Sequence, residues 1–119
     1  MGNKVSIIMG VYNCAATLEE SIDSILAQTY QDWEFVICDD GSTDDTLAIV
    51  ERYAAADPKR FLVLKNEKNM GLNATLNRCL RAAQGIYIAR QDGDDISAPD
   101  RFEKEVAFLD AHPELAAEA

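Results

Sequence analysis

The stretch Val5-Ser6-Ile7-Ile8-Met9, followed by Gly10-Val11-Tyr12-Asn13, decides the fold class. Its apolar residues are nearly continuous rather than alternating with polar ones, which is typical of a strand buried on both faces of a parallel sheet. Three similar runs follow at residues 35–38, 61–64 and 86–89, separated by longer amphipathic stretches. This repeated alternation predicts a Rossmann-like three-layer α/β/α fold with a mainly parallel sheet.

Local signals predict where the helices between and after these runs begin and end. A capping box of Thr17 and Glu20 is expected near the start of the first helix. Ser42 is expected to cap the second helix, with Asp44 and Asp45 in its first turn, and Ser97 with Pro99 is expected to open the last helix. The third helix is predicted to bury one face and to stop at Gly85; that face carries Leu72, Leu76, Cys79, Leu80 and Ala83. Trp33 is predicted to lie in the core.

Composition limits the class of protein and its partners. The chain has 119 residues, which suits one domain, and its 11 basic and 21 acidic residues give a net charge of −10. Nucleic acid and anionic lipid are poor partners for such a surface, because phosphate contacts need clustered Lys and Arg. The three cysteines are widely spaced and odd in number, which indicates small buried side chains in a reducing cytosol.

Polar segments follow each predicted strand. They occupy residues 10–13, 39–42, 66–71 and 92–95. Ligands of parallel α/β sheets bind beyond the carboxyl ends of the strands, so these four segments are expected to form one shared site.

Carboxylates dominate two of these segments. Asp92, Asp94 and Asp95 offer the oxygen ligands that Mg²⁺ and Mn²⁺ prefer, although a solvated turn that caps the next helix explains them as well. A turn also explains Asp39 and Asp40 in part, but two adjacent carboxylates exceed what a turn needs. One of them could accept a hydrogen bond from a base N–H.

Taken together, these segments resemble the nucleotide-binding half of the family 2 glycosyltransferases, which have the GT-A fold. The likeness covers nearly all of residues 4 to 113 and rests on five ordered motifs. They are residues 5–13, residues 21–30, Asp39-Asp40-Gly41-Ser42-Thr43-Asp44, Asn69-Met70-Gly71-Leu72-Asn73, and Ala89-Arg90-Gln91-Asp92-Gly93-Asp94-Asp95 with Pro99-Asp100-Arg101.

The resemblance implies a role for each matching residue. Gly10 and Tyr12 would line the base pocket, Asp40 would bond the base with Asp39 beside it, and Gly71 and Asn73 would shape the nucleotide side of the cleft. Asp94 would be the principal ligand of a Mn²⁺ or Mg²⁺ ion, Asp92 would contact that metal or the ribose, and Arg90 would approach the phosphates or pair with these carboxylates.

The resemblance also implies the reaction and the partners. Such enzymes transfer a sugar from a nucleotide-diphosphate sugar, often UDP-linked, to an acceptor hydroxyl with inversion; the acceptor is a saccharide, a lipid-linked molecule or a protein. Residues 1–119 are therefore expected to be a partial catalytic domain that lacks the acceptor half, with its general base beyond residue 119 and no turnover alone. Self-association through an apolar sheet edge or an apolar helix-packing face is expected. A cytoplasmic location is also expected, peripheral at the membrane face in the full-length protein.

Two other functions fit parts of the pattern. A receiver domain of two-component signalling has similar length and an acidic metal cluster. It also needs an acidic pair after the first strand and a lysine after a fifth strand, and the sequence shows neither. A non-catalytic module that binds sugar nucleotides is the second alternative. Phosphorylation by acetyl phosphate would identify the first.

Overall fold

Four parallel strands form a single sheet in the order β3-β2-β1-β4 within residues 4–116, which the computed structural model describes. The strands are β1 (Val5–Val11), β2 (Trp33–Asp39), β3 (Phe61–Lys65) and β4 (Tyr87–Arg90). The helices are α1 (Ala15–Leu26), α2 (Thr46–Ala56), α3 (Leu72–Ala82), α4 (Arg101–Ala111) and the short α5 (Pro113–Ala116).

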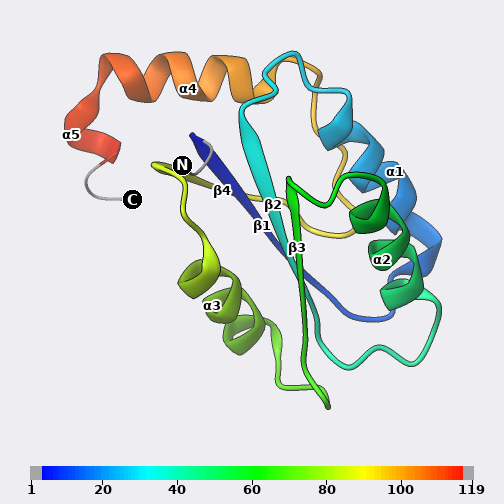
Figure 1. The fold of residues 1–119 in the computed structure, drawn as a ribbon. Helices are drawn as coiled ribbons and strands as arrows, with labels where there is room; N and C mark the ends of the chain where they lie inside the picture. Colours follow the sequence, from blue (N-terminus) through cyan, green and yellow to red (C-terminus); the bar gives the residue numbers. More distant parts are fainter. Residues whose placement is uncertain (1–3, 117–119) are drawn as a thin grey trace.

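Helices cover both faces of the sheet (Figure 1). On one face, β1 and β2 pack against α1, α2 and α4 around buried residues that include Ile7, Phe35 and Phe102. On the other face, α3 packs over Ile8, Val36 and Cys38. This arrangement confirms the predicted three-layer α/β/α fold with a parallel sheet.

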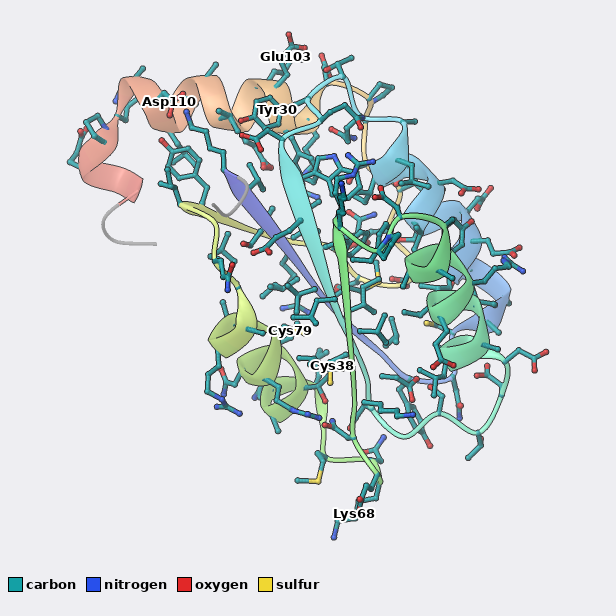
Figure 2. All side chains as sticks on the ribbon, viewed as in Figure 1. Tyr30, Cys38, Lys68, Cys79, Glu103 and Asp110 are labelled. Atoms are coloured by element: carbon teal, nitrogen blue, oxygen red, sulfur yellow. The ribbon has the colours of Figure 1, made fainter. Side chains whose placement is uncertain are left out.

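The core contains Trp33, as predicted, with no exposed surface. Cys38 and Cys79 are also fully buried, and Figure 2 shows them together between α3 and the sheet. All three cysteines are free, and Cys14 is half-buried. No helix within residues 4–116 is long and apolar enough to span a bilayer.

The predicted helix starts are wrong in detail, because tertiary contacts use the polar residues. Helix α1 begins at Ala15 without a capping box, and Thr17 Oγ1 donates to the carbonyl of Gly93 at 2.9 Å. Helix α2 begins at Thr46 rather than after Ser42, whose hydroxyl accepts from Asn13 N at 3.0 Å. Helix α4 begins only at Arg101, beyond Ser97 and Pro99.

Helix α3 also differs from its prediction. Leu76 and Cys79 are buried, but Leu72 and Leu80 are exposed. The helix ends at Ala82 rather than at Gly85, whose N–H instead donates to Ser6 Oγ at 2.7 Å.

Candidate functional site

The loops after β1 and β2 are joined to each other at the carboxyl edge of the sheet. Asn13 adopts a left-handed conformation (φ 48°), which Asn tolerates better than most residues. Its Oδ1 accepts a hydrogen bond from Thr43 N at 2.8 Å, and the N–H of Asp40 donates to the carbonyl of Val11 at 2.8 Å. These bonds fix the two loops that follow the central strands.

Asp40 holds the loop after β3 in place. Its carboxylate, which is almost fully buried, accepts from Met70 N at 2.7 Å, Asn66 Nδ2 at 2.9 Å and Gly71 N at 3.0 Å. Burial alone would raise its pKa, but these hydrogen bonds outweigh it and lower the pKa of Asp40 below the ordinary value. Asp40 is therefore a structural anchor as well as a candidate ligand for a base.

Gly41 makes the close approach of these two loops possible. It has φ 77°, and a Cβ placed on it would lie 2.7 Å from the backbone carbon of Lys68. Only glycine satisfies both conditions. Lys68 lies at the far tip of the loop between β3 and α3, at the opposite end of the molecule from Tyr30 and Asp110 (Figure 2).

A cavity of about 300 Å³ lies between these loops and the start of α3. Four residues predicted from the resemblance line it: Gly10, Tyr12, Asp40 and Gly71. Val11, Asn69 and Leu72 also line it; they belong to the predicted segments and motif but were given no role of their own, and Thr75 lies outside all of them. Thr75 could have been found from its place one helical turn after Gly71, whose carbonyl accepts its hydroxyl at 2.8 Å.

Three other residues predicted to bind nucleotide are not among those that line this cavity. Asn73 is exposed on the first turn of α3. Asp39 is buried, and its Oδ2 accepts from Ser42 N at 3.1 Å, while its Oδ1 has no hydrogen-bond partner among residues 4–116. Asp92 belongs to the separate acidic loop after β4.

The acidic loop brings three carboxylates together. One oxygen from each of Asp92, Asp94 and Asp95 lies within 4.8 Å of the others. Arg90 pairs with Asp92, with Nε to Oδ1 at 2.9 Å, as one of the two roles predicted for it requires. Asp95 Oδ2 accepts from Asp92 N at 3.1 Å, whereas the Asp94 side chain is exposed and makes no hydrogen bond or ion pair with residues 4–116.

This donor set fits a hard divalent cation. Carboxylate oxygens are the ligands that Mg²⁺ and Mn²⁺ prefer, and the spacing lets all three residues face one ion. Asp94 is available without breaking an existing contact, while Asp92 would have to share its carboxylate with Arg90. The cluster is also strongly negative, so a cation there would lessen the repulsion between its members.

The cavity and the acidic loop belong to the same edge of the sheet. A Cβ placed on Gly93 would lie 2.7 Å from Cys14 Sγ and 3.5 Å from Val11 Cγ1, and Val11 lines the cavity. Asp40 bonds to that same Val11. The segments after β1, β2 and β4 therefore meet as the strand-end pattern predicted.

Comparison with known proteins assigns this architecture to a family. The model of glycosyl transferase family 2 matches residues 6–117. The chain belongs to glycosyltransferase family 2. This match rules out the receiver-domain alternative, which also fails because Tyr12 and Asn13 follow β1 in place of an acidic pair.

Curated relatives of this family 2 chain are longer proteins. It is 58% identical over 111 residues to the putative glycosyltransferase EpsE of Bacillus subtilis, covering 93% of the chain and 40% of the relative. It is 37% identical over 106 residues to an Escherichia coli glucosyltransferase, WfaP, whose name gives UDP-Glc as donor and a GlcNAc-diphosphoundecaprenol as acceptor. That match covers 89% of the chain and 41% of the relative.

Solved structures share the fold closely. TarS 1-349 of S. aureus, in complex with UDP-GlcNAc, aligns with a TM-score of 0.85 and 32% identity, covering 92% of this chain and 32% of that one. The mannosyltransferase PcManGT of Pyrobaculum calidifontis, in complex with GDP-Man and Mn²⁺, aligns with a TM-score of 0.82 and 31% identity, covering 92% and 33%. The expected family and GT-A fold are therefore confirmed.

Proposed function

We propose that this chain is the donor-binding part of an inverting, metal-dependent glycosyltransferase that uses a UDP-linked sugar. The observation that supports this most is the shared edge: Val11 lines the cavity together with Gly10, Tyr12, Asp40 and Gly71, and its side chain lies next to Gly93 of the acidic loop. Binding of UDP-GlcNAc by TarS supports a UDP-linked donor, and binding of GDP-Man with Mn²⁺ by PcManGT supports a nucleotide sugar held with a divalent cation.

We assign each part of the donor to different residues. The exposed ring of Tyr12 stacks on the base, and the remaining acceptor capacity of Asp40 bonds a base N–H. Asp39 lies behind Asp40, while Gly71 and Asn73 shape the nucleotide side. Asp94 is the main cation ligand, with Asp92 beside it contacting the ion or the ribose. A bound divalent cation would stabilise the charge that develops on the leaving diphosphate.

The chain is proposed to bind donor without transferring sugar. It spans about two fifths of the length of the two curated relatives above. We place the carboxylate that takes the acceptor's proton in a later part of the domain. A saccharide, a lipid-linked molecule or a protein is the acceptor of the whole enzyme, and the proposed location is cytoplasmic, peripheral at the membrane face.

Calorimetry of UDP and GDP binding, with and without Mn²⁺, tests this function. We expect UDP to bind in the presence of Mn²⁺ and to raise the melting temperature, because a ligand that binds only the folded state stabilises it. Asp94→Asn should abolish the Mn²⁺ dependence. Glu51→Gln, which removes one charge from an exposed position on α2, is the matched control and should bind as the unmodified chain does.

Two results would contradict the proposal. Absence of any Mn²⁺-dependent heat with every nucleotide would refute donor binding. Sugar release or transfer by the purified chain would refute the absence of turnover, and binding of nucleotide sugars without any turnover in the full-length protein would favour the non-catalytic module.

A further inference from the structure

A stripe of polar side chains on α1 and the turn after it faces the segment that follows β4. The stripe consists of Thr17, Ser21, Ser24 and Gln28, whose spacing of four, three and four residues places them on one side of the helix. Figure 1 shows the segment after β4 running along α1 from the carboxyl edge of the sheet toward α4. Residues 91–100 contain no helix or strand, so their backbone groups need other partners.

The stripe supplies many of these partners. Thr17 Oγ1 donates to the carbonyl of Gly93 at 2.9 Å, and Ser21 Oγ donates to that of Asp92 at 2.9 Å. Further along, Ser24 Oγ accepts from Ser97 N at 3.0 Å. Gln28 Nε2 donates to the carbonyl of Ala98 at 2.7 Å, and its Oε1 accepts from Phe102 N at 3.1 Å.

Gln91 completes this connection from inside the loop. Its side chain is only 1% exposed, an unusual position for an amide. Its Nε2 donates to the carbonyl of Asp95 at 2.9 Å and to Ser21 Oγ at 3.1 Å. Its Oε1 accepts from Ser97 Oγ at 2.7 Å and from Arg101 Nη1 at 3.1 Å. The amide therefore ties both ends of the acidic loop to α1 and to the start of α4.

We propose that the α1 stripe and Gln91 are positioning residues that hold the acidic loop in the arrangement that receives a cation; this rests on the proposed function. Three carboxylates gathered within 4.8 Å repel one another, and an irregular loop would relieve that repulsion by opening. Bonds from Ser21, Thr17 and Gln91 to the loop carbonyls oppose this opening. The carboxylates stay gathered before the ion arrives.

Two variants remove the positioning contacts without touching a carboxylate. Ser21→Ala deletes the hydroxyl that bonds both Asp92 and Gln91, and Gln91→Met removes the amide while keeping a similar shape. We expect each to weaken Mn²⁺ binding about tenfold or more, as loss of outer contacts around a metal site commonly does. Isothermal calorimetry with Mn²⁺ measures this without any need for turnover.

Val50→Ala is the matched control, because Val50 is a fully buried core residue of α2 that is not part of the stripe. It should lower the melting temperature yet leave Mn²⁺ affinity unchanged. A general loss of stability would instead reduce affinity in all three variants to a similar extent, and that outcome would overturn the inference.

Amide hydrogen exchange separates this inference from the proposed function. The N–H of Asp95 donates to the carbonyl of Asp92 within the loop, and the N–H of Ser97 donates to Ser24 Oγ of α1. If the loop loosens and each N–H loses its hydrogen bond, its exchange rate should rise about tenfold. If the unmodified chain binds no Mn²⁺, the proposed function fails, and exchange still decides the positioning role. Equal loop exchange in Ser21→Ala and Val50→Ala would overturn that role.

Discussion

The carboxylate of Asp40 accepts hydrogen bonds from Met70 N, Gly71 N and Asn66 Nδ2, all from the loop after β3. Each donor is also a wall or a neighbour of the cavity proposed to hold the base. A single residue thus sets the shape of the pocket before it contacts any ligand. Loss of its charge should affect the folded chain even when no nucleotide is present.

Asp40→Asn should destabilise the chain by about 1–3 kcal/mol at neutral pH, because an amide nitrogen would replace an oxygen that two N–H groups share. Urea unfolding followed by circular dichroism measures this difference. Glu51→Gln, with the same change of charge at an exposed site, should stay within about 0.5 kcal/mol of the unmodified chain.

The pH dependence of that difference follows from the lowered pKa of Asp40. A carboxyl whose pKa is lower in the folded state adds stability above its ordinary pKa of 3.8 and loses it as the pH falls through the folded value. The gap in unfolding free energy between the unmodified chain and Asp40→Asn should therefore be constant above about pH 5 and narrow below pH 4. A gap that widened on acidification would contradict this account of Asp40.

At the scale of the elements, the first turn of α1 depends on residues at the start of α2. Cys14 N donates to Thr46 Oγ1 at 2.9 Å, and Ala15 N donates to Asp44 Oδ2 at 3.3 Å. The two N–H groups lack intrahelical partners, so Thr46 of α2 and Asp44 just before that helix supply the cap that no side chain of α1 provides. The two helices are therefore coupled at the edge that carries the site.

Thr46→Val should lower the unfolding free energy by about 1–2 kcal/mol, since it keeps the shape of a fully buried side chain but removes the acceptor for Cys14 N. Urea denaturation gives the value. Thr43→Val is the control, because Thr43 is exposed and its hydroxyl makes only a 3.4 Å contact with Asn13. Equal losses in the two variants would show that the cap contributes nothing.

The same contacts explain what the sequence could and could not predict. Strand runs and the polar residues after them depend on neighbours in the chain, so the parallel sheet and the gathering of Gly10, Asp40 and Gly71 were predictable. Helix starts were not, because Thr17 and Ser42 bond across the fold to Gly93 and Asn13 instead of capping. The position of Thr75 one helical turn after Gly71 was visible in the sequence, but the packing of α3 that makes Thr75 a wall of the pocket was not.

At the scale of the whole molecule, apolar side chains remain exposed on the α3 side of the sheet. Ile88 lies on the edge strand β4 with 37% of its surface exposed, and the neighbouring Ile86 is 70% exposed. Leu80 of α3 is 43% exposed. An edge strand flanked by apolar surface favours pairing with another copy, so we expect the predicted self-association to take place at the edge formed by β4.

The net charge of −10 acts against this pairing, and the balance between the two should depend on salt. Added salt screens repulsion between exposed charges but leaves apolar attraction in place, so sedimentation velocity should show more association at high ionic strength than at low.

Ile88→Lys should keep the chain monomeric at both ionic strengths, because it places a charge in the middle of the β4 edge. Leu62→Lys, at an exposed position on the opposite edge strand β3, is the control and should leave association intact. Association that weakens with salt would instead indicate contacts between opposite charges and would place the interface elsewhere.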